Sequence, residues 1–372
     1  MLDTIILEIG INDCCEIDFT RFRTTREKVF NGPQVFDKWV NNPTREDKLN
    51  GAYKPKMTLI KRGYEITIKI EFSAPKLLFL NNLDEICEDD FEEIIDVLQA
   101  RMREMGIKIF REKLRIAKVL SFHPSKNILL TGGYTATFAI RELSKVNLNG
   151  HLDLSEKDFR NGGQALQLYS NSHSLVFYDK VSDLNKSKNR AIDKDQTGYQ
   201  QSLFEVVRKN EKNQEILRME VRLSKKRKMN EMLIKVGYSK NPLFKDVINN
   251  DLCQKILNIY WSDTFAKSLF IFDICNGPQK ILQDILWANP NMKIKHAIYL
   301  TGLKLLCKDE EGIRGVRGII GIYRPKTAWG RISEDFKGLE NRRTGIARYG
   351  FVGDIEANLR EFKAFKMEKR AG

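Results

Sequence analysis

The segment ILRMEVRL (residues 216–223) alternates apolar and charged side chains without a break. In an extended chain the apolar side chains share one face: Leu217, Met219, Val221 and Leu223. The charged side chains share the other face: Arg218, Glu220 and Arg222. Strict period-two alternation predicts a β-strand that buries one of its faces. This segment is the clearest strand signal in the chain.

Two hairpins are predicted upstream of that strand. YEITIKIEF (64–72) alternates in the same way, and residues 57–61 precede it across an Arg62-Gly63 turn. Its expected apolar face consists of Tyr64, Ile66, Ile68, Ile70 and Phe72. The second hairpin pairs residues 164–169 with 174–180 across a Ser-Asn-Ser turn. Further strands are expected over residues 2–9 and 116–123.

Helical periodicity occurs between and after these strands. Residues 84–96 hold eight acidic side chains and no basic one, and apolar residues recur there at helical spacing: Phe91, Ile94, Ile95, Leu98 and Met102. This pattern predicts an amphipathic helix with an acidic exposed face, and it does not favour a metal site. A second helix is expected over 134–146. Residues 182–201 are polar enough to form a flexible excursion, and the pattern is helical beyond residue 240.

This order of segments favours an α+β fold, a mostly antiparallel sheet backed by helices, followed by a helical, basic domain. We place the junction between about residues 229 and 242. The first domain then covers residues 1–235 and the second covers residues 240–372.

The composition limits the class of protein. The 372 residues are 42% hydrophobic and 30% charged, which is enough apolar material for a packed core. No apolar run approaches the roughly 18 residues that cross a bilayer. The N-terminus carries Asp3 where a secretory signal carries basic residues, and the six cysteines show no CxxC spacing. We therefore expect a reduced, cytoplasmic protein without a membrane partner.

The charge is strongly positive, with 63 Lys and Arg against 49 Asp and Glu, a net charge of +14. Two stretches account for most of the excess: residues 205–235 have ten basic and five acidic side chains, and residues 313–350 have nine and three. The second stretch also contains Tyr323, Trp329 and Tyr349. Basic residues mixed with aromatic ones suit single-stranded nucleic acid, although such runs are also ordinary solvated surface.

One predicted strand carries a candidate nucleophile. On residues 174–180 the alternation places Tyr178 and Lys180 on the same face. A phenol becomes a nucleophile when a nearby cation stabilises its anion, and the same cation can balance charge on a phosphate. The alternative is a sheet-edge aromatic residue beside solubilising charges.

Three further residues are candidate ligands for Mg²⁺ or Mn²⁺: Glu71, His123 and Glu220. Two carboxylates and an imidazole suit such an ion, which would hold a scissile phosphate. Each residue has a simpler interpretation. Glu220 could form a surface ion-pair ladder with Arg218 and Arg222, His123 could merely end a strand before a proline, and Glu71 could cap the next segment.

Four segments together resemble the filamentous-phage replication initiators, the gene II/X nicking-joining family with its plasmid-borne relatives. They are MLDTIILEIG (1–10), ITIKIEFSAPKLLFLNN (66–82), SNSHSLVFYDKVSDL (170–184) and ILRMEVRL (216–223). The likeness covers roughly residues 1–235 and is loose in the C-terminal third. It implies a rolling-circle endonuclease-like fold and an enzyme that nicks one strand at a replication origin. Such an enzyme becomes joined through tyrosine to the 5′ phosphate and later rejoins the strand.

Carried over to this chain, the resemblance makes Tyr178 the nucleophile and Lys180 the residue that assists with phosphate or leaving-group charge. Glu220 and Glu71 fall on its metal-binding glutamates. The family's aspartate in an Arg-Ile-Asp context is replaced here by Ala117, and His123 takes its place if the register slips by six residues. A His-x-His pair is absent from the sequence.

The expected partners are single- and double-stranded DNA at an origin, together with a host helicase and polymerase. Candidate contacts to the DNA backbone are His173, Arg218, Arg222, Lys225, Lys226, Arg227 and Lys228, and His173 could equally be an ordinary turn residue. Two other functions remain open. One is a non-enzymatic DNA-binding protein, such as a repressor or packaging factor, and the other is a metal nuclease that uses water.

Overall fold

The computed structural model describes residues 1–24, 29–31, 34–49, 53–146, 152–160, 164–184, 215–274, 277–339 and 347–367. Most of the stretch 182–201, for which a flexible excursion is predicted, lies outside these ranges. So do residues 205–214 of the first basic stretch and residues 340–346 of the second.

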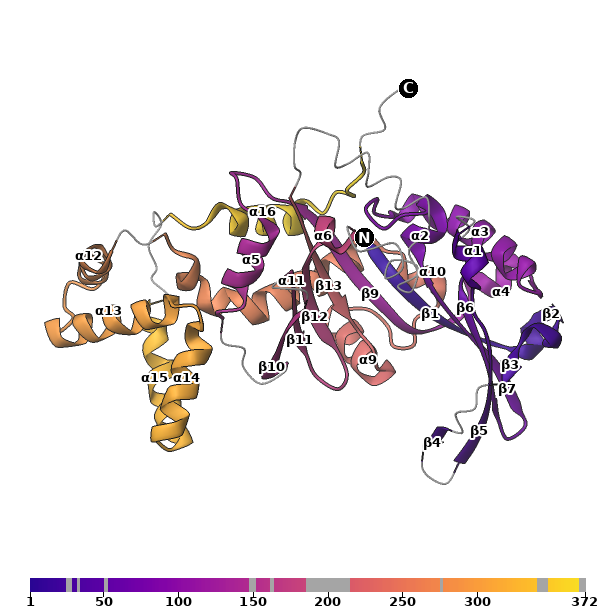
Figure 1. Ribbon diagram of the computed structural model, residues 1–372, viewed down its shortest axis with the longest axis horizontal. Coiled ribbons are helices and arrows are strands. Elements are labelled where there is room, and N and C mark those ends of the chain that lie inside the picture. The colour runs from indigo at the N-terminus through magenta and orange to yellow at the C-terminus, as the bar shows by residue number, and fades with distance from the viewer. Residues whose placement is uncertain are drawn as a thin grey trace.

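The described strands form one long sheet and a small two-stranded sheet (Figure 1). The strands are β1 (Leu2–Gly10), β2 (Cys14–Ile17), β3 (Arg23–Thr24), β4 (Val29–Asn31), β5 (Gln34–Asn41), β6 (Lys56–Arg62), β7 (Glu65–Ser73), β8 (Ile107–Ile109), β9 (Lys118–Leu129), β10 (Asp153–Arg160), β11 (Ala165–Tyr169), β12 (Ser174–Asp179) and β13 (Ile216–Arg222). The order in the long sheet is β10-β11-β12-β13-β9-β1-β7-β6-β5-β3, with β4 paired to β5, and β2 pairs with β8. Every one of these pairings is antiparallel.

Helices connect and cover the strands. They are α1 (Arg45–Leu49), α2 (Ala74–Phe79), α3 (Phe91–Glu104), α4 (Arg111–Arg115), α5 (Ala136–Leu143), α6 (Lys180–Leu184), α9 (Lys226–Lys235), α10 (Phe244–Val247), α11 (Asn250–Phe265), α12 (Pro278–Ala288), α13 (Ile294–Lys308), α14 (Gly312–Tyr323), α15 (Lys326–Leu339) and α16 (Gly350–Glu361). The chain is thus an α+β protein with a large antiparallel sheet.

The two predicted hairpins are present, with one correction in each. The β6–β7 turn consists of Gly63 and Tyr64, because Arg62 pairs with Glu65. Gly63 has a φ of +59°, in the left-handed region that glycine favours, and Tyr64 is fully exposed at the turn rather than on the buried face. In the second hairpin, β12 ends at Asp179, so Lys180 begins α6 instead of continuing the strand.

Strand β9 is longer than the sequence pattern predicts and lies near the centre of the sheet. It continues past His123 and Pro124 to Leu129, with β1 on one side and β13 on the other. The β1–β9 pairing is irregular between Leu2 and Ile5, opposite Pro124, and an irregularity of this kind tolerates a proline inside a sheet. His123 therefore lies within a central strand and does not end one.

The hydrophobic core is continuous from the sheet into the C-terminal helices. Phe177 of β12 packs edge-to-face against Phe265 of α11, with ring centroids 5.6 Å apart, and α16 packs against β9. One cluster of buried apolar residues includes both Ile5 and Ile355. Buried apolar residues on both sides of the predicted domain junction (about residues 229–242), such as Leu223 and Phe244, belong to this one cluster.

Helices α12–α15 project from one end of the sheet, while α2, α3 and α4 gather near β1 and β6 at the other end (Figure 1). Within the described ranges, none of these helices combines the length and the apolar composition that a membrane span requires.

Candidate active site

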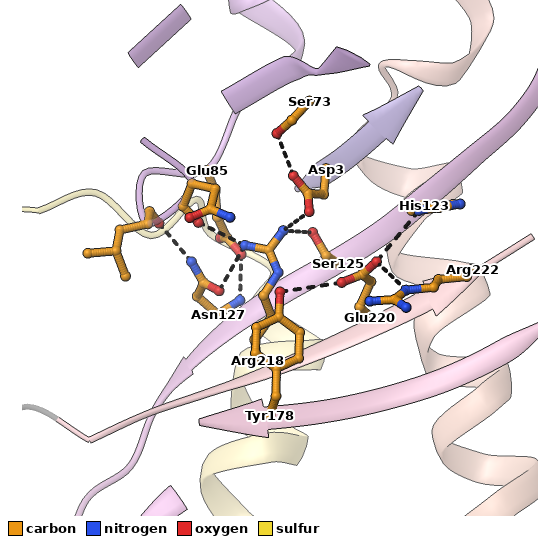
Figure 2. Close-up of polar contacts among 12 residues, drawn as sticks. Asp3, Ser73, Glu85, His123, Ser125, Asn127, Tyr178, Arg218, Glu220 and Arg222 are labelled. Atoms are coloured by element: carbon orange, nitrogen blue, oxygen red, sulfur yellow. Dashed lines mark hydrogen bonds and ion pairs between the residues drawn. The ribbon is translucent and has the colours of Figure 1, made fainter. Parts of the chain in front are cut away.

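Neighbouring strands bring several predicted site residues together on one face of the sheet (Figure 2). On β12, Tyr178 lies opposite Arg218 of β13. On β9, Ser125 lies opposite Glu220 of β13, and His123 is two residues away on the same face. Residues distant in sequence therefore meet because β12, β13 and β9 are adjacent in the sheet.

The Tyr178 hydroxyl is directed at a carboxylate. Its Oη donates to Glu220 Oε2 at 3.4 Å, and the ring is half-buried. The Lys180 ammonium lies 5.4 Å from the centroid of the Tyr178 ring. Lys180 is fully buried. It belongs to α6 and not to β12, so Tyr178 and Lys180 are close together as predicted but do not lie on the same strand.

Glu220 is a buried anion that contacts Arg222 and His123. Arg222 Nε donates to its Oε1 at 2.8 Å, and His123 Nδ1 lies 3.6 Å from the same oxygen. Burial by itself would raise the pKa of Glu220, but Arg222, His123 and Arg218 outweigh burial and lower this pKa well below its ordinary value. Glu220 is therefore a carboxylate at neutral pH. It is better suited to orient a hydroxyl group or bind a cation than to accept a proton.

Arg218 lies beside these groups and is 1% exposed. Its guanidinium donates to the Asn82 carbonyl at 2.8 Å and to Ser125 Oγ at 2.9 Å, and it lies 3.2 Å from Asp3 Oδ2. Burial by itself would lower the pKa of Arg218, but the anionic forms of Tyr178, Asp3 and Glu220 raise it above its ordinary value. The same attraction stabilises negative charge on the Tyr178 oxygen.

Asp3 is the residue that sequence reasoning missed. It is buried, it pairs with Arg218, and its Oδ1 accepts a 2.7 Å hydrogen bond from Ser73 Oγ. Burial would raise the pKa of Asp3, but Arg218 lowers it below its ordinary value. The available signal was an acid near the start of a mostly apolar strand, and a buried acid needs a cation as its partner.

Glu71 lies away from Glu220 and His123. It is more than a third exposed and pairs with Lys69 at 3.4 Å. Its strand β7 lies three positions from β13 in the sheet order, a separation of about 14 Å at the ordinary strand spacing. Glu71 and Glu220 are therefore too far apart to share one metal ion, and the structure does not bring the three predicted ligands together.

The two remaining donors, His123 and Glu220, are compatible with a divalent ion. An imidazole nitrogen and a carboxylate oxygen 3.6 Å apart can share one ion, and Mg²⁺ commonly completes its shell with water and substrate phosphate. Within the described ranges, no group of three or more His, Cys, Asp or Glu side chains is arranged to hold a metal ion.

The candidate DNA contacts fall into two classes. Lys225, Lys226 and Arg227 are exposed at the start of α9, and Arg222 and Lys228 are partly exposed. Arg218 and His173 are buried, and Arg218 is bonded inside the protein, so the structure does not offer Arg218 to a DNA backbone.

Comparison with family models, curated proteins and solved structures gives no significant match for this chain. The geometry around Tyr178 and Glu220 therefore carries the functional proposal.

Proposed function

We propose that this protein initiates rolling-circle replication of a phage or plasmid by nicking and rejoining one DNA strand through Tyr178. The observation that supports this best is the hydrogen bond from Tyr178 to Glu220, a carboxylate held by Arg222 and His123. A half-buried phenol that is oriented by a fixed carboxylate, with the buried Arg218 beside it, is placed to act as a nucleophile. An aromatic residue at a sheet edge needs no such surroundings.

In the nicking step, the Tyr178 oxygen attacks the scissile phosphorus. The new bond joins Oη to phosphorus, and the bond from phosphorus to the 3′ oxygen breaks. Glu220 orients the phenol, whose proton leaves to solvent, and the departing 3′ oxygen takes a proton from solvent. The phosphodiester bond is exchanged rather than hydrolysed, so the reverse attack by a 3′ hydroxyl closes the strand again.

Positive charge around the ring has two sources. Arg218 and Lys180 stabilise the oxygen of Tyr178 when it is the nucleophile and again when it is the leaving group. A divalent ion held by His123 and Glu220 would withdraw charge from the phosphate. The free 3′ hydroxyl would serve a host polymerase, with a host helicase opening the duplex in the cytoplasm.

The deciding experiment is a search for a covalent adduct. The protein is incubated with Mn²⁺ and circular single-stranded DNA of its replicon, and the products are separated under denaturing conditions. We expect a protein–DNA adduct that is lost in Tyr178→Phe and kept in Tyr169→Phe, which removes the same atom from the neighbouring strand β11.

The alternatives give different results. A non-enzymatic DNA-binding protein binds the DNA and never cleaves it. A water-using metal nuclease cuts in the presence of the ion, keeps this activity in Tyr178→Phe, and leaves no protein joined to DNA.

A further inference from the structure

A cavity of about 270 Å³ lies at the opposite end of β12 from Tyr178. It is bounded by the turn before β12, by α9 and by α11. Met232 and Ile259 contribute apolar walls, and His173 and Tyr260 contribute aromatic rings. Lys228 and Lys235 also line the cavity, where they pair with two acidic lining residues, Glu231 at 3.8 Å and Asp263 at 2.8 Å. The mechanism proposed above does not use this cavity.

The Tyr260 hydroxyl is the feature that points to a ligand. Tyr260 is 5% exposed, and within the described part of the chain its Oη is buried and forms no hydrogen bond. Burial raises the pKa of Tyr260, so the hydroxyl keeps its proton and remains a donor. Buried polar groups are rarely left without a partner, because this destabilises the fold.

The rings around the cavity are held in place. The His173 and Tyr260 rings meet edge-to-face, with centroids 5.7 Å apart. His173 Nδ1 lies 2.9 Å from Ser170 Oγ and 3.0 Å from Ser172 Oγ, which fixes the imidazole. Fixed aromatic and apolar walls with one unused donor suit a flat heterocycle that has an acceptor on its edge, as a nucleobase has.

The size of the cavity limits the ligand. Pockets for drug-sized molecules begin at roughly 300 Å³, so this cavity accommodates about one nucleoside and not a stacked pair.

The cavity is joined to the exposed basic run. The backbone amides of Ser224 and Lys225 donate to the Ser172 carbonyl at 3.1 and 3.2 Å. Arg222, which bonds to Glu220, lies opposite Ser174 in the sheet. The positively charged residues from Arg222 to Lys228 therefore run from the Tyr178 site to the cavity. At the ordinary rise per residue, His173 and Tyr178 are about 17 Å apart along the chain.

We propose that this cavity binds one unstacked base of single-stranded DNA, with Tyr260 donating to the base and Lys228 pairing with its phosphate. The inference rests on the proposed function and names what selects the nicking position. Phosphate contacts along the basic run position the strand, and the base contact specifies the sequence at a fixed distance from Tyr178. The cavity would thus supply sequence preference that Tyr178 itself lacks.

The test measures binding without cleavage. Fluorescence anisotropy with the full chain carrying Tyr178→Phe, in EDTA, compares four homopolymers of about 12 nucleotides, one for each base. We expect unequal affinities, with the preferred base bound at least fivefold more tightly than the weakest. Adding Tyr260→Phe should remove most of that preference while keeping the salt dependence. Adding Lys228→Gln should weaken all four homopolymers alike and reduce the salt dependence.

Two controls separate binding from folding. Tyr64→Phe removes the same atom from a fully exposed ring and should change no affinity. Tyr260→Phe should melt at or above the temperature of its parent, because the lost hydroxyl has no partner inside the described protein. A lower melting temperature would show that this hydroxyl has a structural partner and would overturn the proposal.

Three other outcomes also overturn it: equal affinity of the parent for all four homopolymers, an unchanged preference in Tyr260→Phe, or Tyr260-dependent binding of free 5′-mononucleotides alone. The last result would identify a free-nucleotide site. These readouts do not depend on the covalent adduct. The base pocket can therefore fail while Tyr178 still forms an adduct, and it can succeed where no adduct forms.

Discussion

Arg218 and Asp3 form a buried ion pair that also fixes the surroundings of Tyr178. The guanidinium contacts β9 through Ser125 and β1 through Asp3, so one side chain connects three adjacent strands. Such a pair contributes little net stability compared with apolar residues, but removing one partner leaves a buried charge without compensation. The stability of the fold therefore depends strongly on Arg218.

We predict that Arg218→Met lowers the free energy of unfolding by about 3–5 kcal/mol, because Asp3 is left buried and unpaired. Urea denaturation followed by circular dichroism measures this. Arg227→Met is the matched control, since this side chain is 92% exposed and its ion pair with Glu231 is worth at most about 1 kcal/mol. Equal losses in the two variants would contradict the assignment.

The lowered pKa of Glu220 predicts a pH dependence of stability. A carboxyl group whose pKa falls on folding adds stability above its unfolded pKa, and this contribution is lost as pH falls through the folded value. Glu220→Gln should therefore be much less stable than wild type at pH 7, and the difference should shrink below about pH 4. Urea denaturation at the two pH values measures this, and a gap that does not change would refute the prediction.

The same substitution tests the site. Glu220→Gln should reduce adduct formation by at least about 100-fold, because the Tyr178 hydroxyl loses the carboxylate that orients it, while DNA affinity stays within about twofold. Single-turnover nicking and anisotropy measure the two quantities. Normal nicking by this variant would show that Glu220 has no role in the reaction.

At the scale of elements, the first turn of helix α14 contacts the segment that follows α5. The Ile313 amide donates to the Lys145 carbonyl at 3.0 Å, beyond the end of α5. Gly312 precedes it with a φ of +63°, and a Cβ there would lie 2.4 Å from the Lys145 backbone. Both the dihedral angle and the close approach require glycine at this position.

We predict that Gly312→Ala lowers the free energy of unfolding by at least about 2 kcal/mol, because it combines a strained φ with a steric clash. Gly318→Ala, in the same helix with open space around the new Cβ, should instead raise it by about 0.5–1 kcal/mol. Thermal and urea denaturation of the pair check this. Similar effects of the two changes would argue against the close contact of α14 with Lys145.

At the scale of the whole molecule, the net charge of +14 overstates the positive charge available to DNA. Several cations are used inside the protein: Arg218 with Asp3, Lys126 with Glu85, and Lys304 with Asp273. The exposed run at the start of α9 is different, because Lys225, Lys226 and Arg227 all face solvent. We therefore expect this run to dominate the electrostatic part of binding.

Replacing Lys225, Lys226 and Arg227 together by Ala should reduce the slope of log affinity for single-stranded DNA against log salt concentration by about 2, because each phosphate contact contributes about 0.7. Anisotropy titrations at several salt concentrations measure the slope. The control is a triple Ala variant at Arg103, Lys108 and Lys113, which are exposed in the α3–α4 region. A larger change in the control would show that DNA binds mainly to the α3–α4 region.

The sequence by itself located several of the strands and their apolar faces. Period-two alternation located β7 and β13, the spacing of apolar residues located α3, and a Tyr-x-Lys pair identified Tyr178. These are local properties, because alternation and helical spacing depend only on neighbours in the chain.

The tertiary structure alone decided the order of the strands, and the order decides the site. Placing β9 between β1 and β13 joined Asp3, Ser125 and Arg218, and it left Glu71 three strands from Glu220. The charged face of β13, which the pattern alone would leave in solvent, became buried because Asp3 and Asn82 supply partners for Arg218. A charged side chain can be buried only where another segment supplies a partner for it. Which distant segments pair cannot be predicted from the local pattern of either segment.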